Sequence, residues 1–325
     1  MKKFIGCDLG GTNMRAAIVD TETGEVASLT SILTLARDGH EAVMARMAGL
    51  FRTVMASGGI SAAEIGGIGI GVPGVVDLEG GVVLFLPNLP GNWRNVPLAA
   101  TINDRLGLPV FLLNDVRAIT FGEWKFGAGQ GVDTVACFAI GTGIGGGLVI
   151  NGKLHLGIGG TAGELGHQTI DFNGPLCGCG NRGCLETYAS GPAITAMGLK
   201  AVTQGLTTCI GSLVDYDLNR ITPKVIAQAA MQGDAIAKDI FEQAGYYLGI
   251  GVANVLVSIS PHKVVIGGGV SACGDLLLNP IRRTIKERVH VMPVEQVEVV
   301  QARLGNNAGA IGAALWAKEN ISGRG

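Results

Sequence analysis

Apolar residues along this chain occur in short runs that end at glycine or at a polar residue. Near the N-terminus, such runs predict three short strands joined by glycine-bearing turns. Apolar residues then recur at helical spacing between 40 and 57, and we expect that helix to end at Gly58-Gly59. The elements predicted for this first part are strands at Phe4–Cys7, Arg15–Asp20, Glu25–Ser31, Ile65–Val72 and Val110–Leu113, and helices at 40–57, Pro97–Leu106 and 116–126.

A second series of strands, again separated by glycine turns, begins at Thr134 and repeats the opening of the chain. A plan that occurs twice predicts two related α/β halves that face each other across a cleft. The strands predicted here are Thr134–Ile140, Gly146–Ile150, Lys153–Leu156, Val264–Ile266 and 296–300, and the helices are 190–201, 223–232, 235–258, 275–289 and 307–318.

Composition narrows the class of protein. Glycine accounts for 53 of 325 residues, well above the average of about 7%. Lys and Arg (24) nearly balance Asp and Glu (26), and no basic tract occurs, which argues against a nucleic-acid partner. The apolar segments stop well short of the roughly 20 residues that a membrane helix needs, and Phe4–Cys7 is too short for a signal peptide. We therefore expect a soluble, cytoplasmic protein without a membrane partner.

One segment has the chemistry and spacing of a zinc site. His167, Cys177, Cys179 and Cys184 supply one imidazole and three thiolates, the donor set of a tetrahedral Cys₃His site. A metal takes one ring nitrogen of a histidine and leaves the other free to donate a hydrogen bond. The ring, beside Glu164, could thus be aimed at a polar ligand such as a polyol. The alternative is a structural zinc site in which the nearby glutamates have no ligand role.

Three glycine-rich turns follow strands and could bind phosphate or a nucleotide, because successive backbone N–H groups form an anion-binding nest. The alternatives are a hairpin turn, a bulge that curves the sheet, and a plain strand–helix turn. Two matching loops, one in each half, favour phosphate binding. The residues concerned are Asp8, Gly10, Gly11, Thr12 and Asn13 in the first turn, Gly141, Thr142, Gly143 and Gly145 in the second, and Gly267, Gly268 and Gly269 in the third.

Two acidic side chains stand at strand ends. Asp8 could hold Mg²⁺ through water, since Mg²⁺ keeps several waters and binds few carboxylates. Asn114-Asp115 follows the strand Val110–Leu113, where a carboxylate that faces a cleft is well placed to act as a general base. The alternative is a helix N-cap, a position that both Asn and Asp favour.

Taken in order, these motifs resemble the ROK family of repressors and sugar kinases over nearly the whole chain. The pair Glu164-x-Gly166-His167 and Cys177-x-Cys179-Gly180-x-x-Gly183-Cys184-x-Glu186 is highly specific, whereas the glycine loops alone would not be. The resemblance implies an α/β, actin-like (ribonuclease H-like) fold with two domains and an interdomain cleft, in which the last helix packs on the N-terminal domain. The implied domains are residues 1–116 plus 307–325, and residues 117–306 with the zinc loop.

The resemblance also implies roles for individual residues. Asp115 is similar to the family's catalytic base, and the glycine loops to its contacts with ATP. His167 and the three cysteines are similar to its structural Zn²⁺ ligands. The positions implied to contact the substrate are Gly74, Asn88, Asn114, Asp115, Glu164, His167 and Glu186.

The implied activity is ATP-dependent phosphorylation of a hexose. Glucose is favoured because residues 91–98 look most like glucokinases, although Gly91-Asn92-Trp93 carries one residue more than the usual Gly-Trp. A second departure is Val116-Arg117-Ala118, where many members have a small residue and Asn. Alternatives are a kinase for N-acetylmannosamine, N-acetylglucosamine, fructose, mannose or allose, and a non-catalytic sugar sensor. The family suggests a homodimer or homotetramer, and its repressors carry a DNA-binding module before the first loop, for which Asp8 leaves no room.

Overall fold

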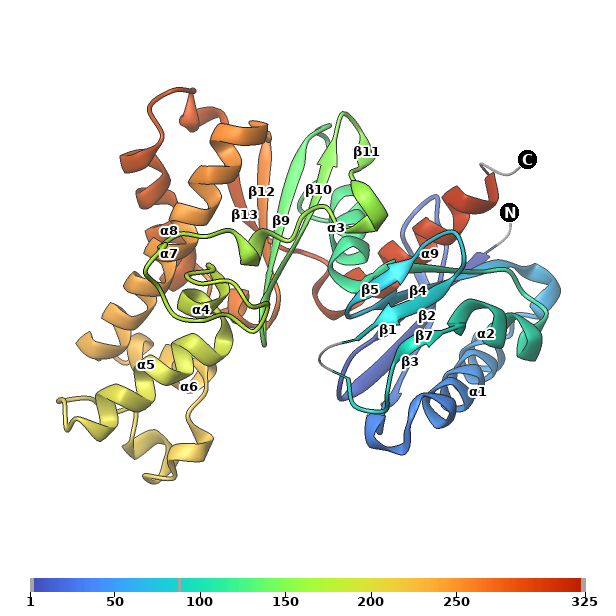
Figure 1. Ribbon diagram of the computed structural model, residues 1–325, viewed down its shortest axis with the longest axis horizontal. Coiled ribbons are helices and arrows are strands. Elements are labelled where there is room, and N and C mark those ends of the chain that lie inside the picture. The colour runs from blue at the N-terminus through green and yellow to red at the C-terminus, as the bar shows by residue number, and fades with distance from the viewer. Residues whose placement is uncertain (1–2, 87–88, 323–325) are drawn as a thin grey trace. The chain divides into compact units, whose positions relative to one another are not determined.

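In the computed structural model, which describes residues 3–86 and 89–322, the chain divides into two compact units (Figure 1). The first unit contains Met1–Gly131, Lys153–Gly163 and Arg303–Gly325, and the second contains Val132–Gly152 and Glu164–Ala302. The chain therefore passes between the units several times.

The first unit is built on a five-stranded sheet in the order β3-β2-β1-β4-β8. β1 is antiparallel to β2 and parallel to β4, and β4 is parallel to β8. The elements of this unit are β1 (Lys3–Leu9), β2 (Asn13–Val19), β3 (Val26–Leu33), α1 (His40–Gly58), β4 (Ile65–Val72), α2 (Leu98–Leu106), β8 (Val110–Asn114), α3 (Asp115–Phe126) and α9 (Ala308–Ser322).

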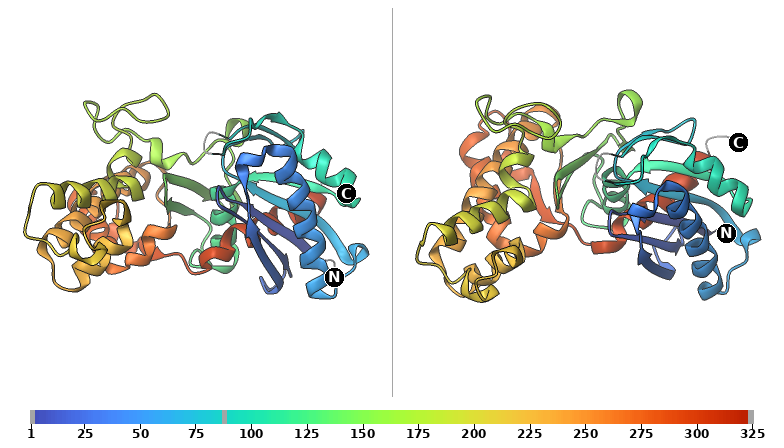
Figure 2. Two further views of the ribbon diagram at one scale, coloured as in Figure 1. Left: turned by 90° about the horizontal axis from the view of Figure 1, so that it is seen from below. Right: turned by 60° about the horizontal axis from the view of Figure 1, so that its bottom comes forward.

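Alternate residues of β1 face different helices, as the period of two in a strand requires. Ile5 and Cys7 join the cluster of buried side chains that includes α1, whereas Phe4 joins the cluster that includes α9. α9 lies directly on the backbone of the sheet, because a Cβ atom on Gly6 would come within 1.7 Å of the Ala310 carbonyl oxygen. Figures 1 and 2 show this C-terminal helix beside the N-terminal strands, as the family resemblance implied.

A small three-stranded sheet in the first unit was not expected from the sequence. It consists of β5 (Val75–Asp77), β6 (Val82–Phe85) and β7 (Arg94–Val96), all antiparallel. These strands have three or four residues each, too few to produce a recognisable alternation of apolar and polar positions.

The second unit repeats the plan of the first. Its strands lie in the order β10-β9-β12-β13, with β9 antiparallel to β10 and parallel to β12, just as β1 pairs with β2 and β4. The predicted duplication is therefore confirmed. The elements are β9 (Val135–Ile140), β10 (Ile144–Ile150), α4 (Glu186–Ala189), α5 (Gly191–Thr203), α6 (Pro223–Met231), α7 (Ala235–Ile259), β12 (Lys263–Gly267), α8 (Asp275–Arg288) and β13 (Glu298–Gln301), and the short β11 (Lys153–Leu154) follows β10 along the chain.

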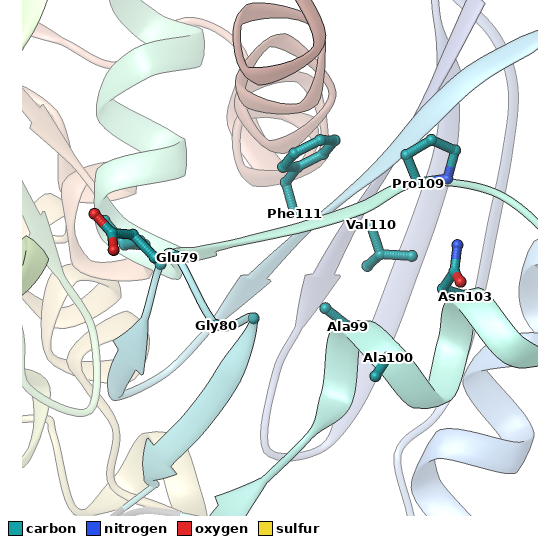
Figure 3. Close-up of a pocket in the computed structure, with 10 residues that line it drawn as sticks. Glu79, Gly80, Ala99, Ala100, Asn103, Pro109, Val110 and Phe111 are labelled. Atoms are coloured by element: carbon teal, nitrogen blue, oxygen red, sulfur yellow. The ribbon is translucent and has the colours of Figure 1, made fainter. Parts of the chain in front are cut away.

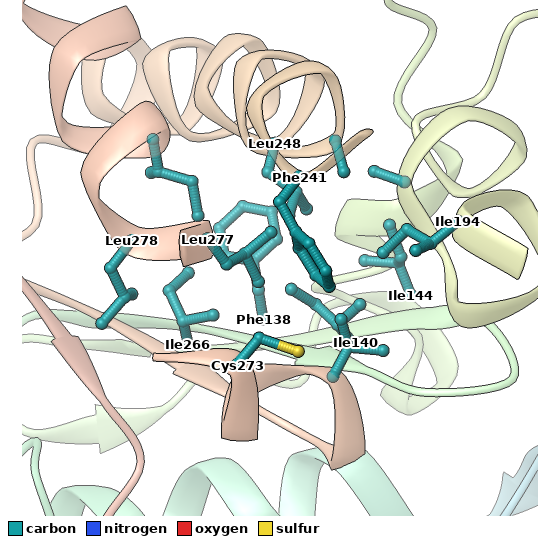
Figure 4. Close-up of a cluster of buried hydrophobic side chains, with 14 of the residues drawn as sticks. Phe138, Ile140, Ile144, Ile194, Phe241, Leu248, Ile266, Cys273, Leu277 and Leu278 are labelled. Carbon is teal, nitrogen blue, oxygen red and sulfur yellow. The ribbon is translucent and has the colours of Figure 1, made fainter. Parts of the chain in front are cut away.

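The core of the second unit lies between this sheet and its helices. Phe138 and Ile266 of the strands meet Phe241 and Leu248 of α7 and Leu277 of α8, and all five are buried (Figure 4). Phe138 and Ile266 lie on β9 and β12, the strands that lead into the second and third glycine turns, so packing in this core holds the start of each turn in place.

The predicted elements agree closely with the observed ones, apart from β5–β7, the four-residue α4 and several short 3-10 turns. The first unit continues to Gly131, beyond the expected boundary at 116, because α3 packs along α9. Among the described residues, no helix is both long and apolar enough to cross a membrane.

Candidate functional site

The turn between β1 and β2 is anchored by the end of β3. The Gly10 N–H donates to the Asn13 carbonyl oxygen (2.9 Å), which closes the turn. The buried Thr34 donates its hydroxyl to the Gly10 carbonyl (2.7 Å) and its N–H to the Thr12 carbonyl (2.8 Å). These bonds occupy carbonyl groups and leave Gly11, Thr12 and Asn13 exposed at the tip. Thr34 was not among the predicted site residues, because nothing in its local sequence signals a contact 24 residues away.

Asn114 and Asp115 take separate roles at the junction of β8 and α3. The Asn114 side chain caps the helix, since its Oδ1 accepts from the N–H groups of Val116 (3.0 Å) and Arg117 (3.2 Å). Its Nδ2 donates to the Gly74 carbonyl oxygen (3.3 Å). The N-cap interpretation thus holds for Asn114, and this leaves the Asp115 carboxylate as the first side chain of the helix.

The electrostatic surroundings of Asp115 favour a neutral carboxyl group. Burial, and next the charge of Asp8, raise the pKa of Asp115 to about 7, while the Val116 N–H (2.9 Å) and the Arg117 guanidinium act in the opposite direction. Burial likewise raises the pKa of Asp8, against the lowering effect of Arg15. A carboxyl group that titrates near neutral pH is suited to accept a proton in catalysis.

The turn between β9 and β10 is held by Glu186. The Ile144 N–H donates to Glu186 Oε2 (2.8 Å), and a Cβ atom on Gly143 would come within 2.2 Å of the same oxygen. Two further backbone bonds, Gly141 N–H to the Gly143 carbonyl and Gly191 N–H to the Gly141 carbonyl, are each 2.8 Å. Glu186 was expected to contact substrate, and the structure gives one of its oxygens a structural role in the predicted phosphate turn.

The third glycine turn lies next to the second. Gly268 has φ +80° at the end of β12, and a Cβ atom there would come within 2.3 Å of the Ile140 carbonyl oxygen. Only glycine fits both constraints. Ile140 leads directly into Gly141, so the second and third predicted nucleotide contacts come together within one unit.

The four predicted zinc ligands converge. The candidate ligand atoms of His167, Cys177, Cys179 and Cys184 all lie within 4.8 Å of one another. Cys177 Sγ is 3.7 Å from His167 Nδ1, and Cys179 Sγ is 3.7 Å from Cys184 Sγ. Two thiolates on one tetrahedral Zn²⁺ with bonds of about 2.3 Å would be roughly 3.8 Å apart, so the donor set fits zinc in chemistry and in spacing.

The orientation of the His167 ring follows from these distances. Its Nδ1 is the nitrogen that faces Cys177, so Nδ1 would bind the metal and Nε2 would be left to donate to another group. His167 lies in a 3-10 turn (Leu165–His167) that follows the exposed Glu164. A cavity of about 580 Å³ borders this turn, and its lining includes Glu164, His167, Gln168 and, from α7, Asn254.

A separate cavity of about 220 Å³ in the first unit contains none of the predicted site residues (Figure 3). It lies between α2, the β5–β6 turn and the start of β8. The amide of Asn103 at its edge donates to the Leu108 carbonyl oxygen (2.7 Å). We therefore place the candidate phosphate-binding groups in the glycine turns and not in this cavity.

The predicted residues form two groups, one in each unit. The first unit holds Asp8, Gly10, Gly11, Thr12, Asn13, Gly74, Asn114 and Asp115, and the second holds Gly141, Thr142, Gly143, Gly145, Glu164, His167, Cys177, Cys179, Cys184, Glu186, Gly267, Gly268 and Gly269. Asn88 lies outside the described residues.

Comparison with known proteins places this geometry in context. The sequence profile of the ROK family matches residues 4–320. The chain is 39% identical to the glucokinase of Thermotoga maritima over 99% of both sequences. A ROK family glucokinase from Streptomyces griseus, solved in complex with glucose and AMPPNP, superposes with a TM-score of 0.82 at 36% identity, over 98% of this chain and 99% of that chain.

A regulator is also similar. A ROK family transcriptional regulator, a homologue of the E. coli MLC protein, gives a TM-score of 0.85 at 33% identity. The alignment covers 99% of this chain but 79% of the regulator, whose chain is longer. The shared structure therefore spans the whole of this chain in both the kinase and the regulator.

Proposed function

Because this chain belongs to the ROK family, with a two-domain, actin-like α/β fold, we propose that it transfers the γ-phosphoryl group of ATP to the 6-hydroxyl of glucose with Asp115 as general base. The observation that carries the role of Asp115 is its position. It is a partly buried carboxylate at the start of α3, and its pKa is raised to about 7. Near that pH the group can accept a proton and release it again within one catalytic cycle.

The reaction needs positioning and charge neutralisation more than covalent chemistry. Asp115 accepts the proton of the sugar 6-hydroxyl. The hydroxyl oxygen attacks the γ-phosphorus, and ADP leaves. The exposed tip at Gly11 and Thr12, and Thr142 and Gly143 of the second turn, provide N–H donors for the phosphates. The Gly141 and Ile144 N–H groups are bonded within the second unit. Asp8 would hold Mg²⁺ through water, and the ion would neutralise charge on the phosphates.

On the sugar side, Glu164, the Nε2 of His167 and the remaining oxygen of Glu186 pair with hydroxyls away from the reacting end. Asn88, Asn114 and Gly74 complete the expected substrate contacts. A Zn²⁺ ion held by His167, Cys177, Cys179 and Cys184 would fix the orientation of the imidazole. Because each hydroxyl of the sugar pairs with a polar group of the protein, a sugar that lacks one hydroxyl leaves that group buried and unpaired, and it binds less well.

The panel of acceptors is the direct test. ADP release, measured against glucose, mannose, fructose, allose, N-acetylglucosamine and N-acetylmannosamine, should give the highest kcat/KM with glucose. A higher value with an acetamidohexose would overturn the choice of sugar, and turnover with none of them would favour a non-catalytic sugar sensor. The proposed homodimer or homotetramer is measured in the same preparation by light scattering.

The pH dependence of the reaction follows from the raised pKa of Asp115. A general base must be deprotonated, so kcat/KM should rise with pH and reach half its plateau near pH 7. An acidic limb with its midpoint near 4, the ordinary value for an aspartate, would show that the pKa of Asp115 is not raised.

Arg117→Met should move that acidic limb to higher pH. The guanidinium of Arg117 lowers the pKa of Asp115, so its removal raises that pKa further. The change also removes the bond from Nε to the Ala162 carbonyl (2.9 Å), which should destabilise the fold by about 1–3 kcal/mol. A pH–rate profile and a denaturant titration measure the two effects, with the exposed Arg37→Met as control. A limb that stays in place would show that Arg117 does not act on the base.

A further inference from the structure

Gln168 connects three segments that are distant in sequence. Its side-chain Nε2 donates to the Leu165 carbonyl oxygen (2.8 Å), and its Oε1 accepts from Asn254 Nδ2 (3.0 Å). Its backbone carbonyl accepts from the Leu185 N–H (3.0 Å). One residue is thus bonded to the turn before it, to the segment that leads into α4, and to α7.

These segments carry the expected sugar contacts of the second unit. Leu165 stands between Glu164 and His167 in the 3-10 turn, and Leu185 immediately precedes Glu186. The backbone of Gln168 is tied to the second segment, while its side chain restrains the carbonyl of the first. Gln168 therefore links the turn of Glu164 and His167 to the segment of Glu186.

The Leu165 carbonyl, which can only accept, sets which way the Gln168 amide points, and the Asn254 amide pairs with the oxygen that is left. With the amide reversed, Oε1 would face the Leu165 carbonyl oxygen and Nε2 would face the donor nitrogen of Asn254, and both contacts would be repulsive. The neighbouring turn of α7 leaves room for the amide, since Gly251 has no side chain and a Cβ atom there would lie 3.1 Å from Nε2. The two bonds of Gln168 are consequently coupled.

We propose that Gln168 is a positioning residue for sugar recognition, which sets the 3-10 turn carrying Glu164 and His167 against Glu186, and that the bond from Asn254 holds its side chain in place on α7. This inference rests on the proposed function and names a determinant of sugar affinity within it. Neither side chain is required to touch the sugar. Glu186 also holds the second glycine turn, but its segment is bonded to the Gln168 backbone, which side-chain variants keep, so their effect falls on the sugar contacts and not on ATP.

Four full-length variants test the proposal: Gln168→Leu, the isosteric Gln168→Glu, Asn254→Ala, and the double Gln168→Leu/Asn254→Ala. Gln168→Glu keeps the acceptor for Asn254 and replaces the donor to Leu165 with an oxygen. The matched control is Gln243→Leu, an exposed glutamine elsewhere on α7. Glucose Kd by calorimetry, KM for glucose and for ATP, kcat and zinc per chain are measured for each.

We expect both Gln168 single variants to raise the Kd and KM for glucose roughly 10-fold. This is the lower end of the roughly 10- to 100-fold range for loss of a residue that orients a binding side chain. The KM for ATP and the zinc content should be unchanged. Asn254→Ala should raise them less, about 2- to 3-fold. The double variant should be no worse than Gln168→Leu alone, because the two bonds act in series. Gln243→Leu should match the wild type.

Unchanged glucose affinity in Gln168→Glu would overturn the proposal, and so would loss of zinc from the Gln168 variants, which would show a defect in the metal loop instead. If Gln168→Leu does not fold, the exposed Asn254→Ala still carries the test, and wild-type affinity there would refute the coupling. Failure of the proposed function has a different signature, because the wild-type protein itself would then neither bind nor phosphorylate glucose.

Discussion

Asp115→Asn is expected to retain glucose binding while kcat falls by ~10²–10⁴, the usual range for loss of a general base. The amide can still accept the Val116 N–H bond, so the start of α3 should be preserved. It cannot take up the proton of the attacking hydroxyl at neutral pH. Steady-state kinetics and glucose calorimetry on the same preparation separate the two properties.

The fold should not suffer from this substitution. Desolvation and the charge of Asp8 disfavour the ionised form of Asp115, so a neutral amide removes an unfavourable charge. The melting temperature of Asp115→Asn should therefore equal or exceed that of the wild type. Asp104→Asn, an exposed carboxylate on α2, is the control and should have normal kcat. Full turnover in Asp115→Asn would remove Asp115 from the mechanism, and loss of glucose affinity would make it a sugar ligand instead.

Cys179→Ser should have the second large effect. One Zn²⁺ per chain is expected in the wild type, and the variant should lose most of it, because a serine hydroxyl is a poor substitute for a thiolate ligand. With the imidazole of His167 no longer held, the KM for glucose should rise by roughly 10- to 100-fold. Metal analysis and kinetics on the purified variant measure both, and the KM for ATP should change much less.

Cys209→Ser is the matched control for this prediction. Cys209 lies outside the cluster of four ligands and is only partly buried, so its replacement should leave both zinc content and glucose KM unaltered. Wild-type protein without zinc would contradict the metal assignment. Zinc loss without any change in glucose affinity would show that the metal has only a structural role. That is the alternative interpretation of the cysteine loop.

The local pattern was sufficient for most of the fold. Short apolar runs and glycine turns predicted the strands that now appear as β1–β4 and β8–β10, and helical spacing predicted α1 to within one residue of its observed end. Such elements are defined by neighbouring residues, so their signal is present in a short window. The strands β5–β7 escaped notice because each is too short to show a period and each depends on its partners in the small sheet.

By itself, the sequence determined which chemical groups are present and their order: the imidazole and thiolates with metal-ligand spacing, the carboxylate after a buried strand, and two matching glycine turns. Only the tertiary structure decided how they act. Glu186 reaches Ile144 across 42 residues, and the pKa of Asp115 at the start of α3 depends on burial and on Asp8 in β1. Hydrogen bonds and electrostatic interactions act through space, so contacts between distant segments leave no trace in local spacing.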